Sequence, residues 1–292
     1  MIKVVYNWGA GHSFGRHMRD YFEPVLDDAG VDWQNADVLL ESVYCRSSNR
    51  GYDRAVLARA ARGCRLRIFV NWEAHHMDPF YGGGADLAIF NRSDYPRGYR
   101  NPFYYPLFAY AMVKGDPFPE PAPVAADTPF CNAVISNRKA DFRREMLEGV
   151  RRLGEVLDGG AAKDGSRSIP PCGKRAAMAG PLRARFNLCP ENTFAEGYAT
   201  EKAADAFLTR HVPIWAGSPG PMAKFINEGN TIILNDAEAG FKRLRKVMDN
   251  PSVYADMLAA APTPADLAPL YGELVERVRD AARRKGVLKA GF

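Results

Sequence analysis

Charged and amide side chains gather between residues 186 and 217, around a turn that follows an apolar stretch. The apolar stretch, residues 186–189, leads to Glu191 and Asn192, and Glu201 and Lys202 follow ten residues later. A loop that joins a strand to a helix exposes backbone N–H groups and the positive end of the helix dipole, and both favour anions. Because cationic and amide side chains are added to these groups, the pattern indicates a site for an anionic ligand.

The residues around this turn predict a strand, a loop, a helix and a second strand. Thr200 is suited to cap the helix, with Glu201 and Lys202 in its first turn. Apolar and small residues at 203, 204, 207 and 208 recur at helical spacing, so one face of the helix packs on a sheet. A short apolar strand follows His211. In open α/β sheets, ligands bind at the carboxyl ends of the strands, where these polar residues lie.

Similar alternations of strands and helices precede this region. Strands are expected at residues 2–6, 38–40, 66–70 and 87–90, with a helix around 54–62. This alternation is typical of a parallel sheet. A glycine-rich turn after the first strand, from Gly9 to Gly15, permits a dinucleotide-binding interpretation. We favour a tight strand-to-helix turn that needs glycine whatever the ligand, because the turn also holds His and Phe.

A proline-rich segment, residues 117–123, divides the chain, since proline at this density continues neither a helix nor an interior strand. The strand pattern restarts at residues 132–135. We therefore expect an N-terminal domain at 1–127, a second domain at 128–264, and a helical tail at 265–292.

The tail is expected to pack back on the first domain. One side of its predicted helix carries Leu267, Leu270, Leu274 and Val278. Its last stretch is basic, with Arg283, Arg284, Lys285 and Lys289. A solvated basic end is the first interpretation, and contact with an anionic membrane surface is the second.

Bulk properties bound the class of protein. The 292 residues suffice for one large or two medium domains, and the net charge of +5 suits an anionic small molecule or a membrane surface better than nucleic acid. The five cysteines are scattered without a CxxC pair, and we see no signal peptide, which favours a reducing cytoplasm. No apolar run approaches the roughly 20 residues of a membrane-spanning helix. The five histidines lack the spacing of metal ligands.

The order of these residues resembles one family, the alpha-1,3-fucosyltransferases of the bacterial and animal type. Their signature is an apolar strand, a Phe-Glu-Asn triplet, a Tyr-Val-Thr-Glu-Lys pentad and a helix that ends before a Val-Pro strand. Here residues 190–192 read Pro-Glu-Asn and residues 198–202 read Tyr-Ala-Thr-Glu-Lys. Further similarity lies in residues 70–73 and in Ser-Asn at 136–137, followed by Arg143. The similarity covers most of the chain.

The resemblance implies an α/β fold of the GT-B type, in which two Rossmann-like domains face a central cleft. It implies an inverting enzyme that moves L-fucose from GDP-beta-L-fucose to a hydroxyl of an oligosaccharide or glycolipid, at O3 of GlcNAc or glucose. No cofactor is required, and a divalent cation is at most stimulatory. The implied protein is a soluble bacterial form, cytoplasmic or peripheral on the inner face of the membrane. Two alternatives stay open: another GDP-sugar donor, and a nucleotide-sugar-binding protein without turnover.

On the donor side, Arg143 and Lys202 are the candidates for the diphosphate, because arginine offers a planar fork for two oxygens and lysine a compact charge. The alternative is that Lys202 pairs with a neighbouring acid and that Arg143 lies on an exposed helix face. Glu191 is expected to hold the loop through backbone bonds. By resemblance, three further residues contact the donor: Asn192, Tyr198 and Glu201.

On the acceptor side, Glu73 is the candidate general base. Single displacement with inversion needs a group that removes the proton of the acceptor hydroxyl on the face opposite the leaving group. Glu73 follows the strand at 66–70 at its carboxyl end, and Asp78 or Asp94 are the alternatives. The aromatic residues that can stack on a sugar here are Trp72, Phe80 and Tyr81.

Overall fold

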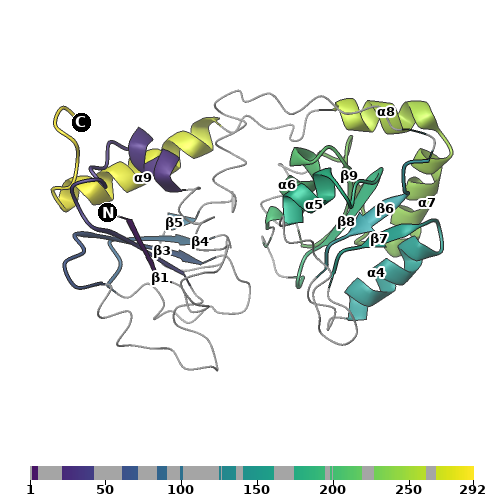
Figure 1. Ribbon diagram of the computed structural model, residues 1–292, viewed down its shortest axis with the longest axis horizontal. Helices are drawn as coiled ribbons and strands as arrows, with labels where there is room; N and C mark the ends of the chain where they lie inside the picture. Colours follow the sequence, from purple (N-terminus) through teal and green to yellow (C-terminus); the bar gives the residue numbers. More distant parts are fainter. Residues whose placement is uncertain are drawn as a thin grey trace. The chain divides into compact units, whose positions relative to one another are not determined.

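The structure is a computed structural model whose chain forms two compact units (Figure 1). The first unit combines Met1–Asp116 with Asp266–Phe292, and the second comprises Pro117–Ala265. The residues that the structure describes are 2–5, 22–42, 61–71, 84–90, 99–100, 125, 127–135, 141–160, 174–194, 198, 200–218, 227–260 and 268–292.

The first unit contains a five-stranded parallel sheet in the order β1-β2-β3-β4-β5. Leu39, Leu40, Ile68 and Phe69 in its middle strands are fully buried, on both faces of the sheet. Strands covered on both faces read as continuous apolar runs, which is why the sequence predicts the first four strands, whereas the two-residue strand at 99–100 was not predicted. Their bounds are β1 Ile2–Val5, β2 Val38–Ser42, β3 Leu66–Asn71, β4 Leu87–Phe90 and β5 Tyr99–Arg100.

The last helix of the chain, α9 (Ala268–Arg284), belongs to this first unit. Its buried face includes Tyr271, Leu274 and Val278, whereas Leu270 is half-buried. The buried face thus includes two of the predicted positions, Leu274 and Val278, and adds Tyr271, whereas Leu267 lies outside the described residues. The helix is tied to the segment before β2, since the Tyr271 hydroxyl donates to Asp28 Oδ2 over 2.6 Å.

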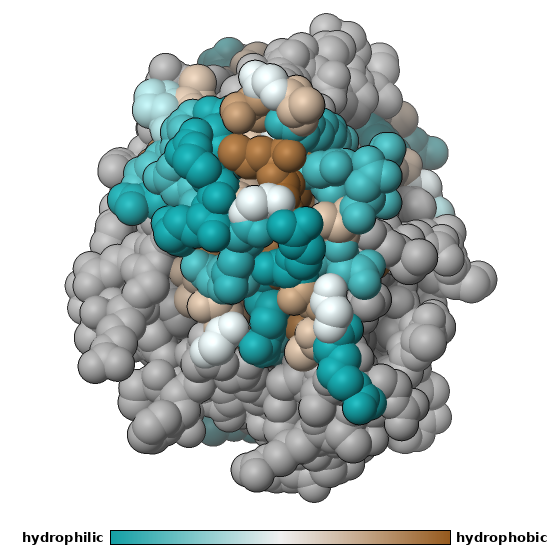
Figure 2. All heavy atoms as spheres, turned by 90° about the vertical axis from the view of Figure 1, so that its left-hand side faces the viewer, coloured by the Kyte–Doolittle hydropathy of each residue, from teal (hydrophilic) through white to brown (hydrophobic). Residues whose placement is uncertain are grey.

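Basic side chains near the C-terminus form ion pairs within the first unit. The pairs are Arg283 with Asp280 at 2.6 Å, Lys285 with Asp86 at 2.8 Å, and Lys289 with Asp27 at 3.0 Å. Figure 2 views the molecule from this side and shows mostly hydrophilic side chains around a small hydrophobic group. Among the described residues, no helix combines the length and the apolar character needed to span a membrane.

The second unit contains a five-stranded parallel sheet in the order β10-β9-β8-β6-β7. The chain runs from β6 outward to β7 and then returns past β6 to β8, so the direction of winding reverses between β6 and β8. A crevice at the carboxyl ends of the strands forms at such a switch point. The strands are β6 Cys131–Ala133, β7 Val156–Asp158, β8 Phe186–Pro190, β9 Val212–Ala216 and β10 Ile232–Ile233. The helices are α4 Asp141–Arg151, α5 Lys174–Ala179, α6 Glu201–Leu208, α7 Ala237–Met248 and α8 Pro251–Ala259.

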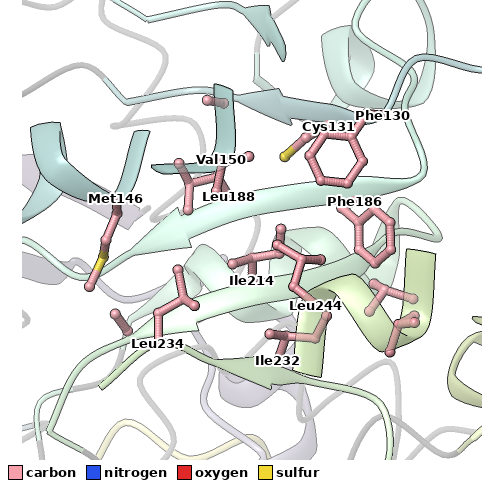
Figure 3. Close-up of a cluster of buried hydrophobic side chains, with 14 of the residues drawn as sticks. Phe130, Cys131, Met146, Val150, Phe186, Leu188, Ile214, Ile232, Leu234 and Leu244 are labelled. Atoms are coloured by element: carbon pink, nitrogen blue, oxygen red, sulfur yellow. The ribbon is translucent and has the colours of Figure 1, made fainter. Parts of the chain in front are cut away.

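A hydrophobic core covers one face of this second sheet (Figure 3). Phe186 lies edge-on to Phe130, with ring centroids 5.3 Å apart, and to Tyr254, with centroids 5.4 Å apart. On the other face, Cys189 and Trp215 form a smaller cluster with Ala206 of α6. Successive strand residues point to opposite faces, so Phe186 and Leu188 enter the main core while Cys189 enters the smaller one.

A buried polar network crosses the second sheet. The Nδ2 of Asn187 donates to Asn132 Oδ1, and Asn132 Nδ2 donates to Leu182 O over 2.6 Å and lies 3.0 Å from His211 Nε2. His211 Nδ1 lies 3.0 Å from the Thr209 hydroxyl, which itself donates to a main-chain oxygen. His211 is therefore the neutral tautomer with its proton on Nδ1. Burial and, secondarily, the charge of Arg183 lower the pKa of His211 to about 4.

Candidate functional site

A small pocket lies at the carboxyl ends of β6 and β8, at the switch point of the second sheet. The two cations proposed from the sequence, Arg143 and Lys202, come from different helices and line this same pocket. The remaining lining residues are Val134, Ile135, Asn187, Leu188, Cys189 and Pro190. The pocket thus has apolar walls and two basic groups, which suits a phosphate-containing ligand.

Arg143 lies in the first turn of α4 and is only 3% exposed. Its Nη1 donates to Asn192 Oδ1 over 3.0 Å, which joins α4 to the loop after β8. Arg143 is therefore not on an exposed helix face. The structure brings Arg143 and Asn192 together, although 49 positions separate them in the chain.

Glu191 follows β8 directly and has no exposed surface. Its Oε1 accepts a hydrogen bond from the Thr200 backbone N–H at 2.8 Å and from Trp215 Nε1 at 3.3 Å. Its Oε2 accepts from the Thr200 hydroxyl at 2.7 Å and from Lys202 Nζ at 3.2 Å. Four donors thus surround one buried carboxylate, which is how proteins accommodate a buried charge. Glu191 holds the loop, as expected, through one backbone bond and three side-chain bonds.

Thr200 occupies the N-cap position of α6, but its side chain does not cap the helix. Its hydroxyl instead donates to Glu191 and accepts from Lys202 Nζ at 2.6 Å. The predicted capping bond is therefore wrong, because the buried carboxylate competes with the helix amides for the hydroxyl. A first turn without a side-chain cap suits an anionic ligand, which can bind its N–H groups.

Lys202 forms an ion pair with Glu191 while its side chain stays 12% exposed. Lys202 therefore pairs with a neighbouring acid, as the alternative expected, and it also lines the pocket.

The end of β9 supports Glu191 from the neighbouring strand. The Glu191 N–H donates to Ala216 O over 2.8 Å, and Trp215 is 1% exposed. A Cβ on Gly217 would lie 2.5 Å from the Trp215 ring and 2.9 Å from Glu191 Cγ, so glycine is required for this close approach. Asn235 fixes the same glycine by accepting its N–H at 3.0 Å and donating to its oxygen at 2.6 Å.

The other sequence-predicted site residues divide into two groups. Tyr198 is 1% exposed, so its ring is part of the packed interior, and Glu201 begins α6. The predicted acceptor-side residues lie outside the described residues, directly after β3 and in the segment that follows it; they are Trp72, Glu73, Phe80 and Tyr81. The alternative bases Asp78 and Asp94 also lie outside the described part of the chain.

Sequence reasoning missed three features of the site. Asn187 lines the pocket, although its position within an apolar strand only suggested a buried residue. Trp215 donates to Glu191, which no spacing rule reveals. Phe194 is 47% exposed and stacks edge-on against Phe142, with ring centroids 4.8 Å apart, next to Arg143 in α4. An aromatic residue in a polar loop was the signal for this last contact.

The described groups can stabilise negative charge but offer no cluster for a metal ion. Arg143 and Lys202 supply cationic donors, and α6 supplies the positive end of a helix dipole. Across the ranges that the structure describes, no group of three or more metal-ligating side chains is found. The arrangement suits the binding of an anion, and charge that develops on a leaving phosphate would be stabilised in the same way.

Comparisons with known proteins place this site in context. No protein-family model matches the chain. The chain is similar to an alpha-(1,3)-fucosyltransferase of Helicobacter pylori, with 29% identity over 140 residues. This similarity covers 46% of the chain and only 27% of the relative's length.

Solved structures give a similarity that extends over nearly the whole chain. A crystal structure of an alpha1,3-fucosyltransferase with GDP matches with a TM-score of 0.65 and 17% identity, over 97% of this chain and 90% of the other. A structure of an alpha1,3-fucosyltransferase with GDP-fucose matches with a TM-score of 0.57 and 18% identity, over 94% and 90%. The predicted α/β fold class of the GT-B type is confirmed. The resemblance to the alpha-1,3-fucosyltransferases is therefore confirmed, in sequence and in fold.

Proposed function

We propose that this protein is a glycosyltransferase that moves L-fucose from GDP-beta-L-fucose to a hydroxyl of a glycan, at O3 of GlcNAc or glucose. The proposed reaction is a single displacement that inverts the anomeric centre. The observation that carries this proposal is the pocket at the switch point of the second sheet, which both Arg143 and Lys202 line.

The two cations account for the leaving group. As the bond between fucose and GDP breaks, negative charge accumulates on the diphosphate, and pre-placed donors stabilise it without having to reorganise. A hydrogen bond to a charged group is worth about 1.5–3 kcal/mol. Arg143 is already oriented by Asn192, and Lys202 by Glu191, so little side-chain entropy is lost when the donor binds.

Other residues of the loop and of α6 complete the proposed donor site. We propose that Glu201, at the first position of α6, contacts hydroxyls of fucose or ribose, and that Asn192 supplies an amide at the same site. Tyr198 is buried and is not among the residues that line the pocket, so we propose that it supports the donor site from the packed interior.

The first unit would supply the base and the acceptor contacts. Strand β3 ends at Asn71, so Trp72 and Glu73 come directly after the carboxyl end of a parallel strand. We propose that Glu73 removes the proton of the acceptor hydroxyl. Trp72, Phe80 and Tyr81 are the proposed aromatic surfaces for the sugar rings.

Relatives support the choice of donor. Crystal structures with the same fold were obtained with GDP and with GDP-fucose. The pocket that Arg143 and Lys202 line is formed by residues of the second unit.

The proposal is tested by incubating the protein with GDP-fucose and N-acetyllactosamine. We expect release of GDP and a new fucosylated trisaccharide, detected by mass spectrometry. A parallel panel of other GDP-sugars tests the donor, because Pro190 stands beside the pocket where the family signature has Phe. GDP binding without turnover of any donor and acceptor pair would instead identify a nucleotide-sugar-binding protein.

Replacement of the proposed base gives a sharper test. We expect Glu73→Gln to abolish transfer, because the amide cannot accept the proton, while GDP affinity stays within about twofold. Asp78→Asn and Asp94→Asn are matched controls that remove a carboxylate from the same segment. If Glu73→Gln keeps near-normal activity and one of the controls loses it, the base is the other acid.

We also propose a cytoplasmic location, with peripheral contact to the inner face of a bacterial membrane through the basic tail. Co-sedimentation with vesicles that contain anionic lipid, compared with neutral vesicles, tests this contact. Equal recovery with both kinds of vesicle would refute it.

A further inference from the structure

We propose that Glu191 is a positioning residue that acts through Lys202: its carboxylate orients the ammonium group for the diphosphate. This inference rests on the proposed function, because it concerns the same donor pocket. It assigns to Glu191 an influence on ligand affinity that a residue holding a loop would not have.

Glu191 does not line the pocket, whereas Lys202 does. The carboxylate is fully buried and lies 3.2 Å from Lys202 Nζ. Any effect of Glu191 on a ligand in this pocket therefore passes through another residue. The ion pair between Glu191 and Lys202 provides the direct route.

The orientation of Lys202 is determined by two contacts. Its Nζ donates to Glu191 Oε2 and, at 2.6 Å, to the Thr200 hydroxyl, which itself donates to the same carboxylate oxygen. The three groups form a closed triangle of hydrogen bonds. A flexible four-carbon side chain would otherwise sample several rotamers, so the triangle lowers the entropy that is lost on binding.

The same carboxylate diverts the Thr200 side chain from capping the helix. Thr200 is in the N-cap position, where a hydroxyl ordinarily accepts a bond from a first-turn N–H. Glu191 engages both the hydroxyl and the backbone N–H of Thr200, and the side chain makes no capping bond. The Thr200 side chain is therefore committed to Glu191 and Lys202 and not to the first-turn amides.

Glu191 is itself held by the sheet and not by the loop alone. Trp215 Nε1 donates to it at 3.3 Å, and its backbone N–H bonds to Ala216 O at 2.8 Å. Gly217 admits this approach because it lacks a Cβ. The paired strands β8 and β9 therefore fix the Glu191 carboxylate, and this carboxylate in turn fixes the position of the Lys202 ammonium group.

A double-mutant cycle tests the inference, with GDP as the probe and calorimetry as the measurement. The four proteins are the wild type, Glu191→Gln, Lys202→Met, and the double variant. We expect Glu191→Gln to weaken GDP binding about tenfold when Lys202 is present, and by less than about twofold in the Lys202→Met background, because coupled residues are not additive. An exposed carboxylate in the second unit, Glu228, provides the matched control Glu228→Gln, which should leave the affinity unchanged.

Thr200→Val is the second variant and serves if Glu191→Gln does not fold. It leaves the charges of Glu191 and Lys202 unchanged. It removes the hydroxyl from the triangle and is expected to weaken GDP binding about threefold or more. Because this hydroxyl is one of the four donors to the buried Glu191, the midpoint of urea unfolding should fall, so GDP binding is measured without urea on protein whose circular dichroism shows it to be folded. For active protein, the KM for GDP-fucose should rise more than kcat falls.

The outcomes separate the two proposals. If the wild type binds GDP and the losses in the cycle are additive, or if Glu191→Gln binds GDP as tightly as the wild type, the positioning role is refuted and the proposed function stands. If the wild type does not bind GDP at all, the proposed function fails and this inference fails with it.

Discussion

Acid should destabilise the second unit through His211, which is 2% exposed directly before β9. Its Nε2 faces two donors, Asn132 Nδ2 at 3.0 Å and the Ala184 N–H at 3.4 Å. A proton on Nε2 would turn these contacts into donor–donor repulsion. Burial, with a contribution from the charge of Arg183, lowers the pKa of His211 from 6.5 to about 4.

The sign and size of the effect follow from this difference in pKa. The unfolded chain takes up the proton below pH 6.5, whereas the folded protein resists it until about pH 4. The stabilisation by neutral His211 is therefore complete above pH 6.5 and is lost as the pH falls from 6.5 to 4. Its full size is about 3 kcal/mol, at about 1.4 kcal/mol for each pH unit. Between pH 7.5 and 5.0, we expect a loss of about 2 kcal/mol from this group. That is a large share of a typical stability of about 5–15 kcal/mol.

Urea unfolding of the whole chain at pH 7.5 and 5.0 measures this loss. Trp215 is the only tryptophan in the sequence of the second unit, and Trp215→Phe identifies the part of the fluorescence signal that belongs to it. The matched control is His211→Gln, whose side-chain oxygen can accept in place of Nε2 but cannot titrate. We expect the wild type to lose about 2 kcal/mol more than His211→Gln on acidification. Equal losses in the two proteins would refute the reasoning.

Three further predictions test the site and its support. Arg143→Lys keeps the charge but removes the planar fork, so GDP affinity measured by calorimetry should fall about tenfold or more; an unchanged affinity would argue against a phosphate contact. Asp236→Ala removes the side chain that accepts from the Ala239 N–H at 3.0 Å and caps α7, and should cost about 1 kcal/mol in urea unfolding, whereas Asp236→Asn should cost far less. Phe186→Ala removes a fully buried ring between two aromatic neighbours and should cost about 3–5 kcal/mol, so a loss below about 1 kcal/mol would contradict the packing in Figure 3.

The sequence predicted the longer strands for a physical reason, whereas the short strands β5, β7 and β10 were not predicted. Strands β3 and β8 are apolar runs because helices or other segments cover both faces of a parallel sheet, and such runs stand out without knowledge of the partners. The placement of Lys202 at the start of a helix after β8 was predicted for a similar reason, since local spacing alone defines the first turn of α6.

Contacts that depend on strand pairing could not be predicted in this way. Thr200 looked like a capping residue because its local sequence favours one, but the pairing of β8 with β9 buries Glu191 beside it and diverts the hydroxyl. The bond from Trp215 to Glu191 spans 24 positions and arises from the same pairing. On α9, Tyr271 is buried whereas the predicted Leu270 is only half-buried. This difference arises because the rotation of the helix about its axis depends on its contact with the segment around Asp28.

The path of the chain through its two units has a consequence for how the protein matures on the ribosome. The second unit, Pro117–Ala265, is continuous, so all of its strands and helices are synthesised before α9. The first unit needs α9, whose Tyr271 and Arg279 bond to the segment at Asp28 and Ala29, and so it must wait for a helix made some 240 residues later. Although N-terminal domains usually fold first during synthesis, the first unit here can be complete only after the last residues of the chain have been made.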